Sequence, residues 1–386
     1  MHIHIRRIAF AVSFAAVSSA SVYSQIASKE ATATAPVAAI YIQGHDGVYV
    51  ENANTAGTLT AVKGSPVWVS GQMSGIRGSY LVSAGTDDLR TYKLESNGLP
   101  GSKVGEIDTQ GYSGSPCGTI DGGAVLDHTG QYLAVPLFGG ATCAALQTYK
   151  IASNGDFTFL GDAESTDGVH SDIYQVGVSA ISSNDLFAYG VQSQQEATVF
   201  LAYKRGAAGD WVTDESFTEK DPTFNPSDYN YAPWLVAADN AGHLAVVMNQ
   251  PFGPNCCSTF SLASYTIDNQ TGAIESTNTY TNMPVLKIYA SDMAMSWSGN
   301  LVAVVGLGLQ IFHFNGAAPA TAFGGVLLPK VNIAQVAWDK NNHLYALSTQ
   351  TQQLYVYTVT PTSITEAPGS PYKANQWQSL VVVPKS

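Results

Sequence analysis

The sequence predicts an all-β protein, and three observations lead to that prediction. Glycine (36 residues) and tyrosine (20) are abundant, whereas charged residues make up only 12% of the chain, a composition typical of β-proteins. No long stretch places apolar residues at helical spacing. Residues 333–372 hold four short apolar or alternating runs, each closed by turn-forming residues, as expected for strands. Four antiparallel strands in about 40 residues make one blade of a β-propeller.

A single blade cannot bury both of its faces, so residues 333–372 require neighbours of the same kind. We letter the strands of each blade A to D. The A–B turn of this unit recurs upstream, at residues 127–130, 182–185, 239–242 and 296–299. The turns are about 40 to 57 residues apart, which is a propeller period. Their Asp, Asn, Ser and Gly residues cap the turn or adopt positive φ.

Two other elements repeat. Asn97-Gly98, Asn154-Gly155 and Thr271-Gly272 each separate two strand-like runs, and Asn-Gly between such runs predicts a hairpin. The D-strand segment LTAVKGSP (residues 59–66) matches ITEAPGSP (residues 364–371) in pattern and partly in identity.

The repeats predict seven blades of four antiparallel strands. The first unit lacks strand A, and one strand, SLVVVP at residues 379–384, is left over at the C-terminus. If that strand supplies the missing strand A, strands from both ends of the chain close the ring and remove its exposed sheet edges. A six- or eight-bladed ring is the alternative, should the long third or fifth unit be divided differently.

The N-terminus indicates export. Residues 1–20 combine a short basic start, an apolar run and a small-residue cleavage site, as in a secretory signal peptide. The apolar run is too short to span a bilayer. Residues 21–37 are predicted to be a flexible linker, and residues 38–386 a single propeller domain. We therefore expect a periplasmic or secreted protein without a membrane span.

The charge balance limits the partners. Loss of Arg6 and Arg7 with the leader would leave 15 Lys and Arg against 29 acidic residues, a net charge of −14. No basic cluster exists, so nucleic acid is not expected as a partner. A monomer is expected, with an acidic surface that promotes solubility.

Four cysteines follow the leader: Cys117, Cys143, Cys256 and Cys257. An exported protein permits disulfides. Cys117 and Cys143 fall in the same repeat, so we favour that pair, which leaves the adjacent Cys256 and Cys257 as a vicinal bridge or two free thiols. No C-x-x-C spacing is present, so neither a metal site nor a cofactor is predicted.

Strand C of the last unit, LYVYTV at residues 354–359, and the APGSP segment at residues 367–371 resemble the blade signature of YVTN-like propellers of the lactonase family, related to bacterial 6-phosphogluconolactonase. The resemblance implies a seven-bladed propeller and a lactonase-like activity. The family's Gly-x-His motif has one match, at Gly168-Val169-His170. Its acidic segment after strand B has no counterpart, because residues 136–140 read PLFGG. Its A-B turn proline is missing from most blades.

The loops from strand D of one blade to strand A of the next line one mouth of a propeller's channel. Lactone hydrolysis needs a base that activates water and donors for the developing oxyanion. The Gly-x-His match assigns the base to His170, with Asp172 or Asp121 orienting it and Lys330 polarising the carbonyl. Further residues of these connections are candidates for ligand binding: Tyr229, Tyr231, Trp234, Tyr289, Asp292 and Asn332. His128, His243 and His343, at the A–B turns, are expected to be turn and surface residues.

Two functions follow from these patterns. The first is a hydrolase of a lactone or related ester at the channel mouth. The second is a non-catalytic propeller that binds a protein, a glycan or a small ligand through its loop face, since one fold hosts many functions. The aromatic segment at residues 224–234 favours binding, and the grouping of His170, Asp121, Asp172 and Lys330 in one pocket would favour catalysis.

Overall fold

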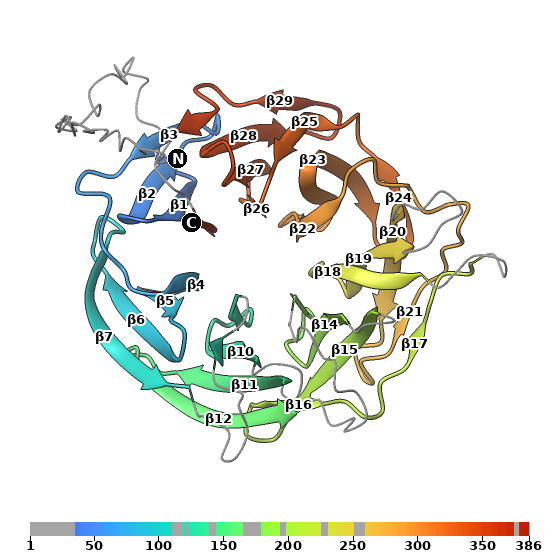
Figure 1. Ribbon diagram of the computed structural model, residues 1–386, viewed down its shortest axis with the longest axis horizontal. Helices are drawn as coiled ribbons and strands as arrows, with labels where there is room; N and C mark the ends of the chain where they lie inside the picture. The colour runs from blue at the N-terminus through green and yellow to red at the C-terminus, as the bar shows by residue number, and fades with distance from the viewer. Residues whose placement is uncertain are drawn as a thin grey trace, which may run out of the picture. The chain divides into compact units, whose positions relative to one another are not determined.

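The protein forms a ring of seven sheets (Figure 1). The computed structural model describes residues 35–109, 119–120, 123–138, 144–164, 179–193, 198–224, 231–250, 259–373 and 378–385. The propeller unit comprises Ala35–Ser386. No helix that could cross a membrane occurs among these described ranges. The seven sheets confirm the predicted seven-bladed, all-β fold.

The ring closes through strands from both ends of the propeller, as predicted. Blade 1 consists of β31 (Ser379–Pro384), β1 (Ala38–Gly44), β2 (Gly47–Ala53) and β3 (Leu59–Ala61). Strand β31 pairs antiparallel with β1 from Ala38 opposite Pro384 to Gln43 opposite Ser379. This pairing satisfies the inner edge of β1 and supplies the missing strand A.

The other blades follow in chain order. Blade 2 contains β4 (Gln72–Arg77), β5 (Tyr80–Ala84), β6 (Asp88–Leu94) and β7 (Pro100–Asp108). Blade 3 contains β8 (Thr119–Ile120), β9 (Val125–Leu126), β10 (Tyr132–Phe138), β11 (Ala144–Ile151) and β12 (Phe157–Glu164). Blade 4 contains β13 (Ala180–Ile181), β14 (Phe187–Ser193), β15 (Thr198–Arg205) and β16 (Trp211–Thr213).

The remaining blades differ in strand number, with five strands in blades 5 and 7 and four in blade 6. Blade 5 contains β17 (Glu219–Lys220), β18 (Ala232–Ala238), β19 (His243–Gln250), β20 (Thr259–Ile267) and β21 (Ile274–Glu275). Blade 6 contains β22 (Ala290–Met295), β23 (Leu301–Asn315), β24 (Ala318–Ala322) and β25 (Leu327–Asn332). Blade 7 contains β26 (Gln335–Trp338), β27 (His343–Ser348), β28 (Gln353–Val359), β29 (Ile364–Glu366) and β30 (Tyr372–Lys373). Strand β17 pairs parallel with β21, so blade 5 is not purely antiparallel.

The A–B turns have the capping geometry that their sequences predict. The Oδ1 atom of Asp239 accepts hydrogen bonds from the backbone N–H groups of Ala241 and His243, both at 2.8 Å. The corresponding aspartate of blade 7, Asp339, repeats this pattern with Asn341 and His343. Side chains from the turn thereby satisfy backbone donors that the strands leave free.

His343 corrects one expectation. It begins β27 at the predicted turn, but its side chain is buried, with only 1% exposed, and is not a surface residue. Its Nδ1 lies 2.7 Å from Oδ2 of Asp339, and the Tyr345 hydroxyl donates to the same oxygen at 2.9 Å. A neighbouring blade covers the turn, because a Cβ on Gly57 of blade 1 would lie 3.1 Å from the His343 ring.

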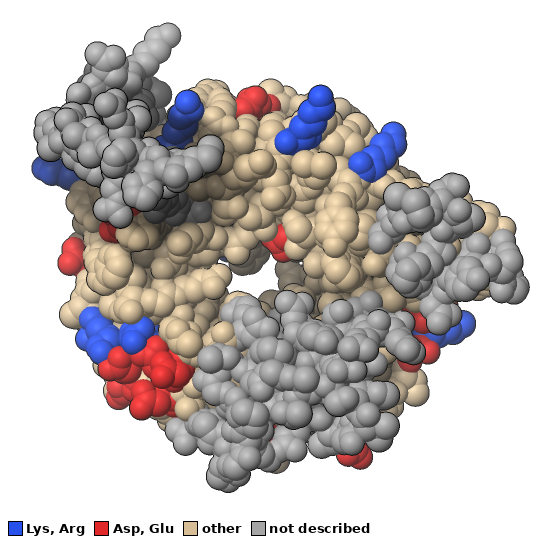
Figure 2. Space-filling model, viewed as in Figure 1, with Lys and Arg blue, Asp and Glu red and all other residues tan. Residues whose placement is uncertain are grey.

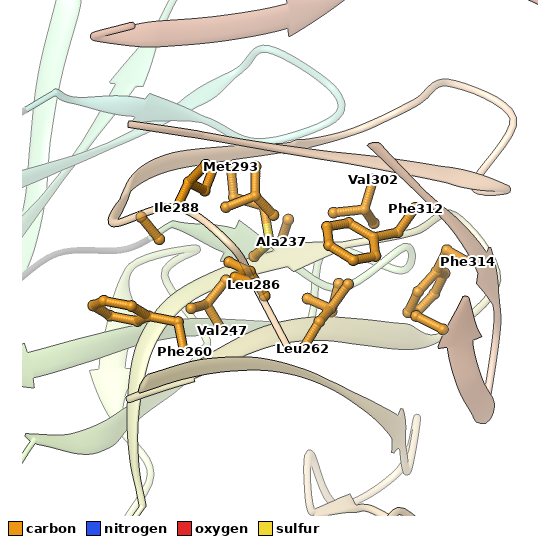
Figure 3. Packing of buried hydrophobic residues seen from close by; sticks show 14 residues of the cluster. Ala237, Val247, Phe260, Leu262, Leu286, Ile288, Met293, Val302, Phe312 and Phe314 are labelled. Carbon is orange, nitrogen blue, oxygen red and sulfur yellow. The ribbon is translucent and has the colours of Figure 1, made fainter. Parts of the chain in front are cut away.

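The core lies between the blades. Between blades 5 and 6, aromatic and aliphatic side chains from facing strands pack together (Figure 3). Phe260 and Leu262 come from β20, whereas Val302 and Phe312 come from β23, and Phe312 is fully buried. Each blade thus buries its faces against its two neighbours, as the repeat argument requires.

Hydroxyl groups also tie successive blades together at the C–D turns. The Tyr41 hydroxyl of blade 1 donates to the carbonyl oxygen of Gly98 in blade 2 at 2.9 Å. The Tyr189 hydroxyl of blade 4 donates in the same way to Gly272 of blade 5 at 2.8 Å. Both glycines have positive φ, 88° and 75°, the conformation that the predicted turns need.

Candidate functional site at the channel mouth

One end of the ring carries both the D–A and the B–C connections, because the strands of each blade run antiparallel. We call this end the mouth. Its described parts include Tyr231 and residues 286–292 and 328–334. Figure 2 shows the ring open along its axis. Side chains from different blades can therefore face a shared space at the mouth.

Four consecutive blade boundaries are bridged near the axis by hydrogen bonds that involve a side chain. We call these bonds the inner latches. They join Trp234 Nε1 to the Ala290 carbonyl (2.8 Å), Val336 N to Asp292 Oδ2 (2.9 Å), Leu380 N to Gln335 Oε1 (2.7 Å) and Met73 N to Gln43 Oε1 (2.8 Å). They connect blades 5 to 6, 6 to 7, 7 to 1 and 1 to 2, which rigidifies that part of the mouth.

Asp292 provides the latch between blades 6 and 7. Strand β22 has an irregularity between Ala290 and Asp292, opposite Gly306 of β23. Only glycine fits at position 306, because a Cβ there would lie 1.7 Å from the carbonyl oxygen of Tyr289. The Asp292 carboxylate accepts from Val336 N at 2.9 Å and from Met293 N at 2.8 Å. The bulge thereby turns this carboxylate toward the next inner strand.

The environment of Asp292 disfavours its charge. Burial raises the pKa of Asp292 to about 6, although the two backbone N–H groups oppose this rise. Burial penalises the charged form because the protein solvates it less well than water does. Burial also raises the pKa of Glu51 to about 7, but Glu51 lies on β2, the third strand from the axis. Asp292 is the group with a pKa near neutrality on a described inner strand.

The latch itself does not need a carboxylate. At the next boundary the neutral amide of Gln335 accepts the N–H of Leu380 at 2.7 Å, and Gln43 does the same for Met73. An amide oxygen therefore suffices for this contact, without the cost of burying a charge. A costly ionisable group where a neutral one would serve is a mark of a functional position.

Lys330 and Asn332 lie on β25, which approaches the strand of Asp292. Asn332 is opposite Leu307 in the pairing of β25 with β23, and the Ser291 hydroxyl donates to the Ile333 carbonyl at 3.2 Å. Leu328 and Lys330 both have positive φ, 51° and 78°. Non-glycine residues rarely adopt this conformation, and such residues cluster at functional sites.

An aromatic group lies beside Asp292. The Tyr289 ring makes edge contacts with Phe260 (5.1 Å between centroids) and Trp234 (6.2 Å). Trp234 is fixed in turn by its hydrogen bond to Ala290. Tyr289 nevertheless remains 55% exposed. Its position is therefore held by packing while much of its surface is free to contact a ligand.

The structure places the remaining predicted residues as follows. Tyr231 stacks on Phe224, with ring centroids 4.1 Å apart, so these two rings support each other at the start of β18. Six residues lie outside the described ranges, and their roles stay predictions: Asp121, His170, Asp172, Tyr229, Cys117 and Cys143. The Cys256-Cys257 pair lies outside them too. The structure thus brings Trp234 and Tyr289 into contact next to the strand that carries Asp292, and it places Asn332 opposite Leu307 in the same blade.

Sequence reasoning missed Gln43 and Gln335. Each is one polar residue in an otherwise apolar strand, a signal that marks a buried polar contact but not its partner. Among the residues that the structure describes, no group of three His, Cys, Asp or Glu side chains is placed to hold a metal ion.

The chain is a seven-bladed β-propeller, and solved propellers with lactonase names share its fold. The periplasmic gluconolactonase PpgL of Pseudomonas aeruginosa aligns over 90% of this chain and 99% of its own, with a TM-score of 0.64 and 10% identity. A protein of Lactobacillus plantarum aligns over 91% and 100%, with a TM-score of 0.63 and 13% identity. A Bacteroides fragilis protein, provisionally named a 6-phosphogluconolactonase, aligns over 90% and 98% (TM-score 0.60, 10% identity).

No protein-family model and no curated protein sequence matches this chain. At 10–13% identity the structural similarities establish the shared fold. They confirm the resemblance that the blade signature at residues 354–359 and 367–371 indicated. Activity has to be argued from the mouth itself.

Proposed function

We propose that this protein is an exported hydrolase that opens a lactone or a related ester at the mouth of the propeller. The observation that carries the proposal is Asp292, a carboxylate on an inner strand whose pKa burial raises to about 6. A general base works best when its pKa lies close to the working pH. The lactonase names of two structural neighbours add support for the reaction class.

Asp292 acts as general base in this proposal. Its carboxylate takes a proton from a water molecule while the water oxygen bonds to the lactone carbonyl carbon. The tetrahedral intermediate then breaks its bond to the ring oxygen, which receives that proton from Asp292. The product is the open hydroxy acid, and the carboxylate is regenerated. The latch to Val336 fixes the direction of the carboxylate throughout.

Lys330 supplies the positive charge that the developing oxyanion needs. Lys330 has positive φ and lies on β25, which pairs with β23 in the same blade as Asp292. The Gly-x-His segment predicts His170, oriented by Asp172 or Asp121, as the alternative base in place of Asp292. Asn332 and the aromatic residues bind the ligand.

Export rests on the first 20 residues, whose basic start, apolar run and small-residue site fit a signal peptide. Expressing the full chain with its own leader tests this part of the proposal. We expect a mature protein outside the cytoplasm whose N-terminus begins near residue 21. A product retained in the cytoplasm with Met1 intact would contradict export.

The activity is tested with the mature protein and a panel of sugar and aryl lactones. We expect turnover by the wild type and a loss of about 100-fold or more in kcat for Asp292→Asn, the usual weight of a general base. Asp87→Asn is the matched control, because Asp87 is exposed and follows strand β5 at the mouth. His170→Ala separates the two bases. A wild type inactive on the whole panel would favour the non-catalytic binding propeller.

A further inference from the structure

The segment that leads into β22 leaves apolar side chains uncovered at the mouth. Leu286 and Ile288 are buried in the core between blades 5 and 6 (Figure 3), whereas Val285 and Tyr289 are each 55% exposed. This alternation is that of an extended strand with one face in the core. The backbone N–H of Leu286 donates to the Phe260 carbonyl of β20 at 2.8 Å, so the exposed side chains stand on a fixed backbone.

The B–C turn of blade 6 extends this surface. Leu307, at the tip of the turn, is 56% exposed. A Cβ on Gly306 would lie 1.7 Å from the carbonyl oxygen of Tyr289, and a Cβ on Gly308 would lie 3.1 Å from the Ile288 side chain, so the turn lies against the segment on both sides of its tip. Three of the eight large hydrophobic residues that stay exposed in the described part of the chain therefore share one surface. Grouped exposed apolar residues, unlike single ones, indicate an interaction site.

The same surface is basic within an acidic protein. Lys287, in the middle of the segment, and Lys330, on the adjoining β25, are both exposed. From residue 276 to residue 338 the sequence has one acidic residue, the latch residue Asp292. Without these three residues, the 17 basic and 29 acidic residues of the chain become 15 and 28, a balance of −13. We call this surface the blade 6 face, and it consists of Val285, Lys287, Tyr289, Leu307 and Lys330.

The composition of the blade 6 face favours a protein as its partner. An apolar centre with charges around it is typical of protein–protein interfaces. An anionic membrane is usually bound by clusters of about four to eight basic residues, whereas the blade 6 face has two lysines. The net charge of −12 also opposes the approach to an anionic membrane or to a nucleic acid. The lysines, without an exposed acidic neighbour in the same segments, require that the partner be acidic.

We infer that the blade 6 face docks an acidic segment of a partner protein, in which apolar side chains cover Tyr289 and Leu307 and a carboxylate faces Lys287. Opposite charges across an interface steer association and fix its register. This inference does not depend on the proposed hydrolysis. Val285, Lys287 and Leu307 have no part in that reaction, and Tyr289 borders both the docking surface and the proposed active site.

Peptide selection tests the inference on the mature protein. A phage-displayed library of short random peptides is selected on the wild type and counter-selected on a double variant, Lys287→Glu with Leu307→Ser. We expect the retained peptides to be rich in Asp, Glu and apolar residues. Calorimetry should show a loss of about tenfold or more in their affinity for the double variant. The control is Lys93→Glu with Leu186→Ser, which makes the same changes at exposed residues elsewhere and should bind as the wild type does.

The dependence on salt tests the charge itself. Raising the NaCl concentration from about 0.05 to about 0.5 M should weaken peptide binding, because salt screens exposed charges. An affinity that does not change with salt would contradict the role of Lys287. Val285→Ser, at an exposed residue, provides the same comparison if the double variant fails to fold.

The opposite results are equally clear. The inference is overturned if no peptide is retained, if the retained peptides are basic, or if they bind the double variant as well as the wild type. Vesicles that contain phosphatidylglycerol, and the polyuronate alginate, are measured in parallel. If either binds through Lys287 and Leu307 while no peptide does, the blade 6 face serves a membrane or a glycan and not a protein. Peptide binding without any lactone turnover would uphold this inference and reject the proposed hydrolysis.

Discussion

The backbone N–H of Val336 donates a hydrogen bond to the carboxylate of Asp292, at 2.9 Å, across the boundary between blades 6 and 7. The same kind of bond joins Leu380 to the neutral amide of Gln335 at the following boundary. Among the four inner latches of the described residues, that of Asp292 is titratable and the other three are neutral. The neutral amide of Gln335 makes the same contact, so the latch does not require the negative charge of Asp292. The carboxylate of Asp292 is therefore available as the proposed general base.

The first prediction concerns pH and stability. The folded pKa of Asp292 is about 6, above its unfolded value near 3.9. Between these values the folded state holds the proton more tightly, so the free energy of unfolding falls as pH rises. The full effect is about 3 kcal/mol, at 1.36 kcal/mol per pKa unit. Asp292→Asn should lack this fall, and urea unfolding at pH 4 to 7 measures it. If the free energy of unfolding changes with pH in the same way in the wild type and in Asp292→Asn, the pKa of Asp292 is not raised. Asp87→Asn is the control and should follow the wild type.

The second prediction tests a neutral latch. Gln335→Ala removes the acceptor of the Leu380 N–H, and an unpaired donor of this kind costs about 1–3 kcal/mol of unfolding free energy. Urea denaturation gives the value. Gln270→Ala is the control, because Gln270 is exposed in a C–D turn. Equal stability of the two variants would show that the latch contributes nothing.

The third prediction concerns the core between blades 5 and 6. Phe312 is fully buried among side chains of β20 and β23. Phe312→Ala should lower the free energy of unfolding by about 3–5 kcal/mol, through lost burial and the cavity left behind. Leu186→Ala, at a residue that is 47% exposed, should change it by less than about 0.5 kcal/mol. A small loss for Phe312→Ala would mean that the blade boundary collapses around the cavity.

The fourth prediction concerns the hydroxyl contacts between blades. Tyr189→Phe removes the 2.8 Å bond to the Gly272 carbonyl and keeps the ring. We expect a loss of about 1 kcal/mol in the free energy of unfolding, the usual net value of such a bond. Tyr280→Phe, at an exposed tyrosine, should be neutral. Thermal unfolding of both variants provides the comparison, and coincident transitions would argue against a stabilising bond.

The fifth prediction addresses ring closure. Deleting residues 379–386 removes β31 and uncovers the edge of β1, where Ile40 and Ile42 are fully buried. An unpaired apolar edge promotes association between chains. We expect a truncated protein that unfolds at a lower urea concentration and forms larger species in sedimentation experiments. Deleting only residues 385–386 keeps the pairing and should preserve a monodisperse protein; if both truncations behave alike, β31 is dispensable.

The repeat signals in the sequence were local, and for that reason they could be interpreted correctly. Asp239 and Asp339 cap turns through bonds to residues within four positions. The GSP segments that looked alike also agree in detail, since Ser65 and Ser370 each accept a backbone N–H from strand C, at 2.8 and 3.0 Å. His343 was misjudged as a surface residue because its burial depends on a loop of blade 1.

The chain alone determined the number of blades and the closing strand, because turn chemistry and strand alternation act over a few positions. Tertiary structure decided the surroundings of the described candidate residues. The raised pKa of Asp292, the latch to Val336 and the supported, exposed ring of Tyr289 depend on atoms from separate strands or blades. Burial and electrostatic environment are set by neighbours in space, which a linear pattern does not specify.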